Sequence, residues 1–537
     1  MAGWNFADMW EAAADQLPDA PAIVQGDRRL SWAEVDRRAD GVAAWLLALG
    51  VAEQDKVAQY LYNCPEYLES MFGAYKAGLV PVNTNYRYGD DELVYLWDNA
   101  DAIAVAFHGS FAERIEGLRA RLPGVRGWLW VDDGSGPCPD WADRYEEVAG
   151  LAPERQRAPW GRDGDHLYLL YTGGTTGMPK GVMWRQDDLI MTMSGQLGAS
   201  MPDEPDYALV RDMRAAPGPV ALPACPLMHG TGALVSMSTL SQGGSVVLLA
   251  GRAYDPEELL DTVDREKANI VVIVGDAFAK PMLRALDAEP GRWDLSSVLA
   301  ITSSGVMWSE ETKQGLLRHH EAMLLMDAFS SSEALGMGTS ISGGGNAAKT
   351  AKFQLGPNAV VITDDGRFAE PGSGDIGMVG VGGRLPLGYY KDDTKTAATF
   401  RTIAGRRYSI PGDYATIEAD GAIRLLGRGS VCINTGGEKV FPEEVEEALK
   451  THQSVRDAVV VGVPDEKWGE AIAALVEAAP GQEPLEAALV AHVKQRLSPF
   501  KAPKRVLFVD TVGRAANGKV DYKRSRAEAI ARLDTTP

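Results

Sequence analysis

Short apolar runs alternate with amphipathic stretches along the first part of the chain. Lys56–Leu61 and Leu79–Asn83 are apolar runs of strand length, and Glu66–Ala77 between them has apolar residues at helical spacing. Strands that alternate with helices form parallel sheets with helices on their faces. The pattern therefore predicts an α/β fold. Further predicted elements are the helices Phe6–Gln16 and Ala33–Leu49, a hairpin of Ala22–Gln25 with Arg29–Ser31, and the strands Ile103–Ala106, His166–Tyr171, Val246–Leu249, Ile270–Val274 and Val298–Thr302.

A capping signal marks the start of the helix Ala33–Leu49. Ser31 precedes this helix, and Glu34 follows Ser31 by three positions. In such a capping box each side chain accepts a hydrogen bond from the backbone N–H of the other residue. Gly50 comes directly after the last apolar position, where a glycine commonly ends a helix.

The pattern changes near Gly356, where the segments become short and β-rich. Turn signals at Asp364–Gly366 and Pro371–Gly374 separate these segments, which predicts a small barrel-like subdomain. A break at Gly427–Ser430 precedes a second helix–strand alternation. Its predicted elements are the helices Val440–Thr451 and Leu485–Leu497 and the strands Ala458–Val463, Ala471–Ala478 and Arg505–Val509. We predict a large domain over 1–428, a smaller α+β domain over 431–537 and a hinge at 428–431.

Composition and charge narrow the class of protein. A chain of 537 residues with 45% apolar residues is too long for one hydrophobic core, which agrees with two domains. The formal net charge of −21 argues against a nucleic-acid partner and against electrostatic attachment to anionic lipid. Four widely spaced cysteines form no C-x-x-C pattern, and no signal peptide or transmembrane segment is predicted. We therefore expect a cytoplasmic enzyme.

A glycine- and threonine-rich loop is the strongest candidate for a binding site. Tyr171–Gly181 reads Y-T-G-G-T-T-G-M-P-K-G and follows the predicted strand His166–Tyr171. Its glycines let backbone N–H groups line an anion site, and its hydroxyls and Lys180 add donors. Val182–Trp184 after the loop has an extended pattern, so a hairpin over a polyphosphate fits better than a Walker A loop that enters a helix. The donors of this loop are Thr172, Gly173, Gly174, Thr175, Thr176, Gly177 and Lys180.

The loop resembles the phosphate loop of the adenylate-forming enzymes, which include acyl-CoA synthetases, peptide-synthetase adenylation domains and luciferases. Four further segments resemble motifs of the same family in the same order: Thr302–Met307, Phe329–Glu333, Pro411–Asp413 and Asn517–Lys519. Each segment alone is equally typical of an ordinary turn or helix cap, but the ordered series is much more specific. The stretch R-G-S-V-C-I-N-T-G-G-E-K-V-F-P-E-E-V-E and the V-G-D-A motif are most similar to actinobacterial fatty-acid and steroid-side-chain CoA ligases.

The resemblance implies a nucleotide site in the middle of the chain. Ser304 and Gly305 would line adenine and phosphate, although the family's Gly-Gly-Ala is Ser-Gly-Val here. Phe329, which replaces the usual tyrosine, would stack on adenine. Ser332 would donate to the α-phosphate, and Glu333 would hold Mg²⁺ together with phosphate oxygens.

The resemblance also assigns roles to four residues nearer the C-terminus. Asp413 would accept hydrogen bonds from the ribose hydroxyls, and Arg428 would contact ribose or phosphate. Ser430 stands where most relatives have a hinge Asp or Lys. Lys519 would be the catalytic lysine that reaches the α-phosphate and the substrate carboxylate.

The acyl and CoA sites are implied by resemblance as well. His229 would gate an acyl pocket built from His229–Leu234 and Val274–Ala279, whose largely apolar residues favour a hydrophobic acid. The lysines of the CoA site are equally typical of a solvated basic patch. The residues implied for CoA are Gly436, Gly437, Trp468, Lys501 and Lys504.

Together these features predict an ATP-dependent acyl-CoA ligase that uses Mg²⁺ and CoA and acts on a medium- or long-chain fatty acid or a steroid-side-chain acid. Relatives are often homodimers. One alternative is an acyl-AMP ligase that delivers to a carrier protein, against which the CoA-side residues argue weakly. Another is a nucleotide-binding protein without turnover, which would not need Lys519.

Overall fold

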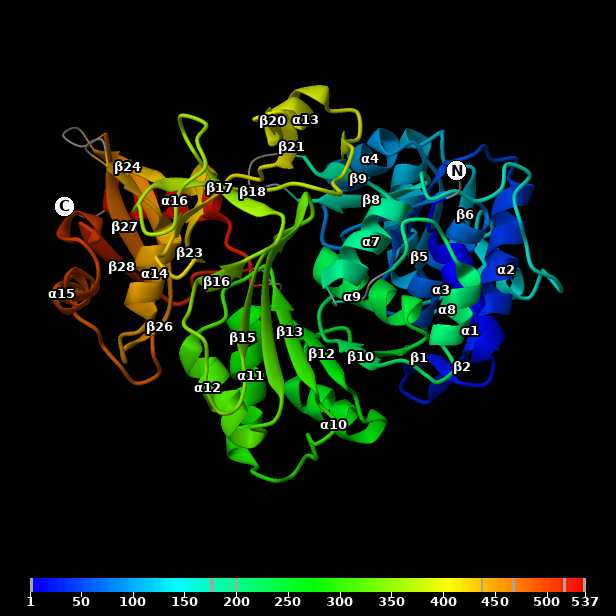
Figure 1. The fold of residues 1–537 in the computed structure, drawn as a ribbon, viewed down its shortest axis with the longest axis horizontal. Coiled ribbons are helices and arrows are strands. Elements are labelled where there is room, and N and C mark those ends of the chain that lie inside the picture. Colours follow the sequence, from blue (N-terminus) through cyan, green and yellow to red (C-terminus); the bar gives the residue numbers. More distant parts are fainter. Residues whose placement is uncertain are drawn as a thin grey trace. The chain divides into compact units, whose positions relative to one another are not determined.

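The structure is a computed structural model that describes residues 3–173, 178–196, 198, 201–435, 438–465, 469–514 and 518–534. Its internal contacts divide the chain into two units (Figure 1). The first unit consists of Met1–Lys349 and Gly382–Ser409, and the second of Thr350–Val381 and Ile410–Pro537. The domain boundary expected at 428–431 lies inside the second unit and stays a prediction.

One sheet of the first unit carries the phosphate-loop hairpin. Its strand order is β19-β9-β8-β4-β3-β5-β6-β7, with parallel pairing from β8 through β7 and antiparallel pairing of β8 with β9 and of β9 with β19. The predicted hairpin is therefore confirmed. The strands are β3 (Lys56–Tyr60), β4 (Val80–Asn83), β5 (Ala102–His108), β6 (Gly127–Val131), β7 (Asp143–Arg144), β8 (Leu167–Thr172), β9 (Lys180–Arg185) and β19 (Gly388–Tyr389).

A second sheet of the first unit has the order β2-β1-β11-β10-β12-β13-β14-β15. The strands from β1 to β14 are parallel. At the two ends of this order, β2 is antiparallel to β1 and β15 is antiparallel to β14. In Figure 1 its green strands lie beside α10, α11 and α12. The strands are β1 (Pro21–Gln25), β2 (Arg28–Ser31), β10 (Val220–Pro223), β11 (Ser245–Leu248), β12 (Ile270–Ile273), β13 (Ala300–Ser304), β14 (Leu324–Ser331) and β15 (Ala334–Ser342).

Helix α2 of the first unit begins where the sequence provides a cap. Ser31 accepts from the N–H of Glu34 and the Glu34 carboxylate accepts from the N–H of Ser31, so the capping box is confirmed. The elements are α1 (Phe6–Gln16), α2 (Trp32–Ala48), α3 (Pro65–Lys76), α4 (Asp90–Asn99), α5 (Ala112–Leu118), α6 (Tyr145–Ala149), α7 (Gln186–Gln196), α8 (Tyr207–Met213), α9 (Gly230–Ser241), α10 (Pro256–Glu266), α11 (Gly275–Ala288), α12 (Glu310–His319), α13 (Asp393–Thr399), β20 (Phe400–Ile403) and β21 (Arg406–Ser409).

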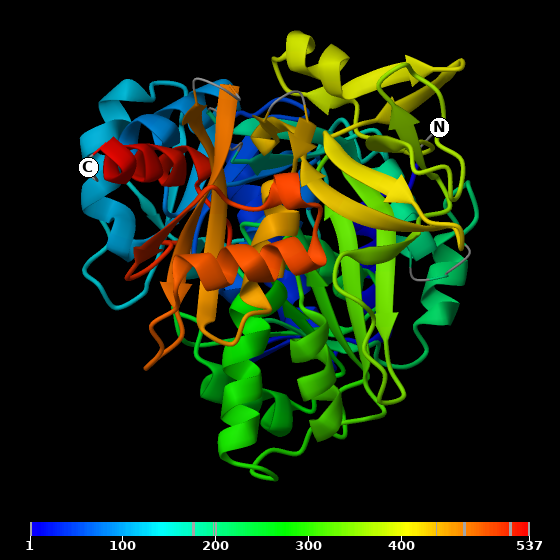
Figure 2. The same ribbon diagram turned by 90° about the vertical axis from the view of Figure 1, so that its left-hand side faces the viewer.

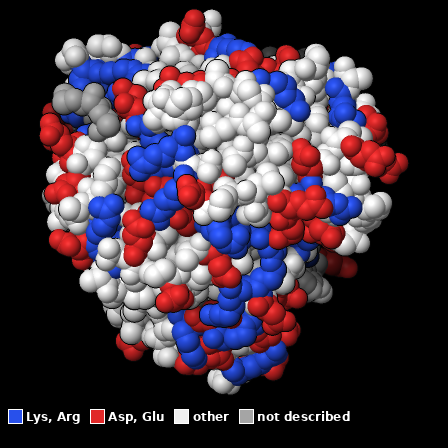
Figure 3. Space-filling view, turned by 90° about the vertical axis from the view of Figure 1, so that its right-hand side faces the viewer, with Lys and Arg blue, Asp and Glu red and all other residues white. Residues whose placement is uncertain are grey.

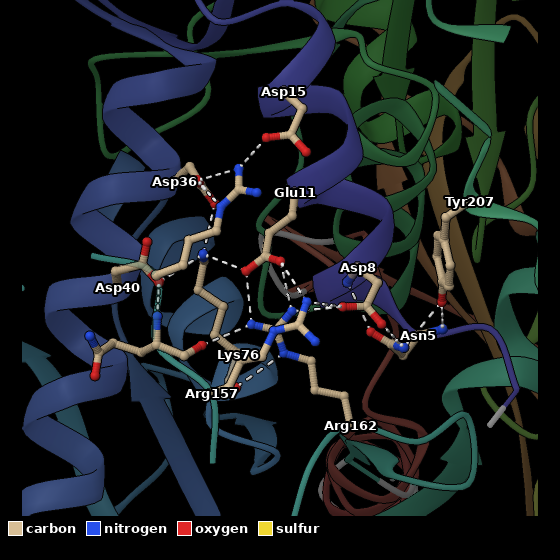
Figure 4. A network of polar contacts seen from close by, with 12 residues as sticks. Asn5, Asp8, Glu11, Asp15, Asp36, Asp40, Lys76, Arg157, Arg162 and Tyr207 are labelled. Carbon is tan, nitrogen blue, oxygen red and sulfur yellow. Dashed lines mark hydrogen bonds and ion pairs between the residues drawn. The ribbon is translucent and has the colours of Figure 1, made fainter. Parts of the chain in front are cut away.

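A buried ionic network joins α1, α2 and α3 (Figure 4). Lys76 at the end of α3 is fully buried, and its Nζ lies 2.8 Å from Glu11 Oε1, 2.7 Å from Asp36 Oδ1 and 2.8 Å from Asp40 Oδ1. Arg162, from the segment that precedes β8, also pairs with Glu11. Although burial by itself raises the pKa of the Glu11 carboxyl, the hydrogen bond from Arg162 and the charges of Lys76 and Arg162 lower it to about 2.

The second unit contains the short β-rich segments and the C-terminal α+β region. The short β-rich segments pair in the order β16-β23-β22-β18, with β17 antiparallel to β18. The elements are β16 (Lys352–Leu355), β17 (Ala359–Thr363), β18 (Ile376–Val381), β22 (Asp413–Ile417), β23 (Ala422–Arg428), β24 (Ile433–Thr435), β25 (Glu438–Val440), α14 (Pro442–Lys450), β26 (Val455–Asp465), β27 (Gly469–Ala478), α15 (Glu486–Arg496), β28 (Arg505–Val509) and α16 (Tyr522–Asp534).

The C-terminal sheet has an apolar core on each face. Its order is β25-β24-β27-β26, with β28 parallel to β27 (orange in Figure 2). Along β26, Val460 belongs to the core that includes Leu489 of α15, whereas its neighbours Val459 and Val461 belong to the core that includes Ala529 of α16. This is the period-two alternation expected of a strand covered on both faces.

Candidate active site

The two ends of the phosphate loop are fixed by the β8–β9 hairpin. Thr172 is the last residue of β8 and lies opposite Lys180, the first residue of β9. Lys180 is half-buried, and its Nζ lies 5.5 Å from the centre of the Tyr389 ring on β19. Gly173 is exposed, and a Cβ added there would lie 3.3 Å from the Tyr88 hydroxyl. The other predicted donors of the loop, Gly174, Thr175, Thr176 and Gly177, lie outside the described residues.

Ser304 and Gly305 lie at the carboxyl end of β13. Ser304 pairs with Ala328 on β14, and Gly305 has φ +92, a conformation that a glycine adopts without steric cost. A Cβ added at Gly305 would lie 4.0 Å from Thr231 Oγ1 in the first turn of α9. The predicted strand-ending turn therefore faces the start of α9, at the edge of a parallel sheet where ligands usually bind.

Ser332 and Glu333 form the turn between β14 and β15. The motif therefore lies in a strand–turn–strand arrangement and not at the start of a helix, which was the alternative interpretation. The indole N–H of Trp184 donates to the Ser332 carbonyl at 2.9 Å, and the Tyr389 hydroxyl donates to Glu333 Oε1 at 2.8 Å. Phe329 lies near the end of β14 and is 9% exposed.

His229 precedes α9 as its N-cap residue. Its backbone N–H donates to the Pro226 carbonyl at 3.1 Å, and its side chain is half-buried. The next residue, Gly230, lies close to the Ser332 turn, since a Cβ added there would be 3.8 Å from Ser332 Oγ and 3.3 Å from Leu170 Cδ2 on β8. The positive end of the α9 dipole therefore lies beside the residue predicted to contact the α-phosphate.

The first unit thus brings together four of the predicted motifs: the ends of the phosphate loop, the His229 turn, Ser304-Gly305 and the Ser332-Glu333 turn. Sequence reasoning missed Tyr389, which contacts both Lys180 and Glu333. Tyr389 comes long after both residues in the chain, so no local sequence motif indicates these contacts.

Asp413 and Arg428 lie in the second unit as register partners on β22 and β23. Arg428 Nε donates to Asp413 Oδ1 at 3.2 Å, and Asp413 is 6% exposed. The Arg428 backbone N–H lies 3.5 Å from Oε1 of Glu443 in the first turn of α14. Burial, together with the charge of Glu446, raises the pKa of the Glu443 carboxyl to about 8. Ser430 lies in the short turn Gly429–Val431 that follows Arg428.

Lys519 is exposed and lies between Gly518, which has φ +75, and α16. Arg514 donates to the Gly518 carbonyl at 3.3 Å and is itself held by Asp457 at 2.6 Å and 2.9 Å. The carbonyl directly before Lys519 is therefore fixed by an arginine whose guanidinium is anchored to β26.

The residues predicted for CoA are only partly within the described chain. Gly436, Gly437 and Trp468 lie outside it. Lys501 forms an ion pair of 2.6 Å with Glu444, and Lys504 donates its backbone N–H to the Ile472 carbonyl at 2.8 Å while its side chain is exposed.

The described residues show neither a surface of one charge in Figure 3 nor a cluster of metal-binding side chains. Basic and acidic side chains are interspersed on the face shown in Figure 3, so they offset one another locally. Among the described residues no group of three or more His, Cys, Asp or Glu side chains is arranged to hold a metal ion. A single carboxylate such as Glu333, completed by phosphate oxygens, still suits Mg²⁺. No helix in the described ranges is both long and apolar enough to cross a membrane.

Comparisons with known proteins agree with the motifs. The profile of the family described as AMP-binding enzyme matches residues 10–390, and the profile of the AMP-binding enzyme C-terminal domain matches residues 444–519. A medium/long-chain-fatty-acid–CoA/3-oxocholest-4-en-26-oate–CoA ligase of Mycobacterium tuberculosis is 40% identical over 98% of this chain and 96% of its own. A 3-oxocholest-4-en-26-oate–CoA ligase of Rhodococcus rhodochrous is 39% identical over 97% of this chain and 95% of its own.

A solved structure shows the same fold. The anthranilate CoA ligase AuaEII, in complex with anthranoyl-AMP, has a TM-score of 0.84, 22% identity, and coverage of 100% of this chain and 99% of its own. The predicted α/β fold and the predicted resemblance to actinobacterial CoA ligases are confirmed. The chain belongs to the AMP-binding enzyme family.

Proposed function

We propose that this protein is an AMP-forming acid–thiol ligase that activates a hydrophobic carboxylic acid for transfer to CoA. The observation that carries the proposal is the convergence of Lys180, the start of α9 and the Ser332-Glu333 turn within the first unit. Relatives that match over nearly the whole chain are named CoA ligases, which supports the same reaction.

The first step forms an acyl-adenylate. A carboxylate oxygen of the acid attacks the α-phosphorus of ATP, and the bond to pyrophosphate breaks with its electron pair leaving on pyrophosphate. Both reactants are anions, so fixed cations and donors must offset their repulsion. Lys180 and the backbone of the phosphate loop bind the β- and γ-phosphates. Ser332 donates to the α-phosphate, and Lys519 contacts the oxygen that carries the developing charge.

Mg²⁺, when bound, neutralises charge on the phosphates. Glu333 is the residue that would hold it. The Tyr389 hydroxyl donates to Oε1 of this carboxylate and so orients it. Asp413 holds the ribose hydroxyls, with its carboxylate positioned by Arg428. Phe329 stacks on adenine, next to Ser304 and Gly305.

The second step makes the thioester. The CoA sulfur attacks the acyl carbon, AMP leaves with the electron pair of the acyl–oxygen bond, and the thiol proton passes to solvent. Lys519 and the CoA loop at Gly436-Gly437 serve different half-reactions. We therefore place a rotation at Ser430, between a large domain over 1–428 and a smaller domain over 431–537.

The acid is a medium- or long-chain fatty acid or a steroid-side-chain acid. The relatives' names support this class, and so do the walls predicted for the acyl pocket. Ala233, Val274 and Ala279 on or beside α9 and α11 are buried and apolar. The one acidic side chain of the second segment is Asp276. Its Oδ1 accepts hydrogen bonds from the Ser309 backbone and hydroxyl at 3.1 Å and 3.0 Å, and its Oδ2 lies 3.2 Å from Lys280 Nζ, so both oxygens already have partners.

The proposal extends to the setting of the enzyme. We place it in the cytoplasm, where ATP, CoA and Mg²⁺ are available and reduced cysteines persist. A homodimer is the proposed assembly. The widely spaced cysteines support the location, and the family resemblance supports the assembly.

The test is acid-dependent release of AMP in the presence of ATP, Mg²⁺ and CoA. The panel contains medium- and long-chain fatty acids, aryl acids and steroid-side-chain acids. We expect turnover with fatty acids, steroid-side-chain acids or both, and none without CoA. The absence of AMP release with every acid of the panel would contradict the proposed activity.

A carrier-protein ligase is the second candidate, and one observation favours it. The Lys501 ammonium is already paired with Glu444 at 2.6 Å, which makes it a weaker ligand for CoA phosphates. This candidate predicts pyrophosphate exchange with the acid but no AMP release that depends on CoA. Competition between CoA and a phosphopantetheinyl carrier protein for the acyl-adenylate separates the two acceptors.

A further inference from the structure

One buried amide connects the phosphate-loop strand with a neighbouring strand. Asn83, the last residue of β4, is 3% exposed. Its Nδ2 donates to the Tyr171 carbonyl at 2.9 Å, and its Oδ1 accepts from the Tyr171 N–H at 2.6 Å. Val82 lies opposite Leu169 in the β4–β8 register, so the side chain continues this pairing where β8 approaches the loop. Asn83 therefore holds both the N–H and the carbonyl of Tyr171, the residue directly before Thr172.

The same amide also holds the turn that presents His229. Asn83 Nδ2 donates its second hydrogen to the Met228 carbonyl at 2.6 Å, and Met228 directly precedes His229. One side chain thus bonds the backbone on both sides of the reaction site: Tyr171, which leads into the phosphate loop, and Met228, which leads into α9. Tyr171 is on β8 of one sheet of the first unit, whereas Met228 lies in the turn that follows β10 of the other sheet.

A second asparagine holds the same turn from the next strand. Asn63, which follows β3, donates to the Cys225 carbonyl at 3.1 Å and accepts from the Leu227 N–H at 2.7 Å. Asn63 has no hydrogen bond to Tyr171 among those of the described residues. The turn before His229 is therefore held from two strands, but only Asn83 also holds the phosphate-loop strand.

An amide is the side chain that this arrangement requires. The site offers two carbonyl oxygens and one N–H, and an amide presents two donors and one acceptor in a plane. An aspartate has almost the same shape, but it has no donors when ionised and would place a charge against two carbonyl oxygens. A loss of these bonds would leave buried backbone groups without partners.

We propose that Asn83 is a positioning residue that sets the separation of the phosphate loop from the His229 turn, and so aligns the acid carboxylate with the α-phosphate. This inference rests on the proposed ligase function. Each substrate is held by its own segment, so its binding alone depends little on Asn83. The reaction depends on both segments at once, and a misplacement of about 1 Å can slow a bimolecular step on an enzyme ~10²-fold.

The test compares the wild-type protein with Asn83→Ala and Asn83→Asp. Single-turnover formation of acyl-adenylate is measured with saturating ATP, Mg²⁺ and an acid that the wild type accepts. We expect the rate to fall on the order of 10²-fold in both variants. We expect the Kd of ATP, measured without acid, to change less than about 3-fold, because ATP alone does not require the two segments to be aligned.

Two matched variants locate the effect. Asn63→Ala removes bonds to the same turn but leaves Tyr171 untouched, so we expect a smaller loss than for Asn83→Ala. Asn85→Ala lies two residues from Asn83, removes only a bond to the Arg87 N–H, and is expected to keep the wild-type rate. Thermal unfolding of every variant gives the folded fraction, to which each rate is normalised.

The outcomes separate this inference from the proposed function. A wild type that activates no acid contradicts the function itself. An active wild type with a folded Asn83→Ala protein that keeps its adenylation rate overturns the positioning role. The role is overturned as well if the loss in Asn83→Ala is matched by an equal rise in the Kd of ATP, or if the isosteric Asn83→Asp keeps the wild-type rate. A rate loss at unchanged Kd supports the role.

Discussion

At the scale of single residues, the two half-reactions should depend differently on Lys519. In the proposed mechanism, Lys519→Ala removes a preorganised cation from the transition state of adenylate formation, and the loss of one such donor costs on the order of 10²–10³ in rate. We expect that loss in acid-dependent pyrophosphate exchange, and less than about 3-fold in thioester formation from pre-made acyl-adenylate. Lys523 is an exposed lysine on α16, and Lys523→Ala is the control. An equal loss in both half-reactions would show that Lys519 does not act in adenylation alone.

The site residues predicted from the sequence belong to short motifs, and residues that contact them from distant positions in the chain were not predicted. Glu333 stands in a five-residue motif and was predicted. Tyr389 and Asn83, which hold Glu333 and the phosphate-loop strand, stand alone in segments without a motif. Their partners are 56 and 88 positions away in the chain, so only the folded structure brings these contacts together.

At the scale of elements, the junction of α1, α2 and α3 should depend strongly on Lys76. Lys76→Met leaves the buried carboxylates of Glu11, Asp36 and Asp40 without their shared cation. Removing one partner from a buried ionic cluster typically costs about 3–5 kcal/mol, because uncompensated charge stays buried. We expect the free energy of unfolding of the first unit, measured by urea denaturation, to fall by that amount, which moves the transition to lower urea.

A surface lysine with similar partners provides the control. Lys267 lies 2.8 Å from Asp264 and 2.9 Å from Asp294, but its side chain is 55% exposed. Solvent screens such pairs, so Lys267→Met should change the stability little. Similar losses in the two variants would mean that the Lys76 network contributes no more than a surface pair.

A pH dependence is expected where β23 meets α14. Glu443 has a pKa of about 8 against an ordinary value of 4.5. Between these values the folded state binds more protons than the unfolded state, so the free energy of unfolding falls as pH rises from 4.5 to 8. Glu443→Gln mimics the protonated side chain and should raise the melting temperature at pH 8 while it changes little at pH 5. Glu483→Gln, an exposed position, should shift neither value. If the free energy of unfolding of Glu443→Gln falls with pH as steeply as that of the wild type, another group causes the pH dependence.

Local patterns predicted most elements but not their grouping. The ends of α1 and β28 agree with the expected ranges, and β13 begins two residues later than the expected strand start at Val298. Spacing and caps decide such boundaries locally. The return of Gly382–Ser409 to the first unit was not predicted. Pairings such as Tyr389 with Val182 decide it, and no periodicity within 382–409 encodes that contact.

At the scale of the whole molecule, the proposed rotation at Ser430 makes catalysis depend on a single turn. The backbone of Gly429–Val431 is a short 3₁₀ turn, whose φ is compatible with proline. Ser430→Pro should therefore preserve the present turn but restrict the φ change that a rotation requires. We expect acid- and CoA-dependent turnover to fall by ~10-fold or more, while at least one half-reaction, measured alone, stays within about 3-fold of the wild type.

Ser430→Ala distinguishes a loss of rotation from a loss of the hydroxyl. Alanine leaves φ free to change, so this variant should keep wild-type turnover. The separate half-reactions are acid-dependent pyrophosphate exchange and thioester formation from pre-made acyl-adenylate. If Ser430→Pro slows both half-reactions to the same degree, the substitution has damaged the site itself. If it slows neither them nor the complete reaction, the two half-reactions do not need a backbone change at this position, and the hinge must be sought elsewhere between 428 and 431.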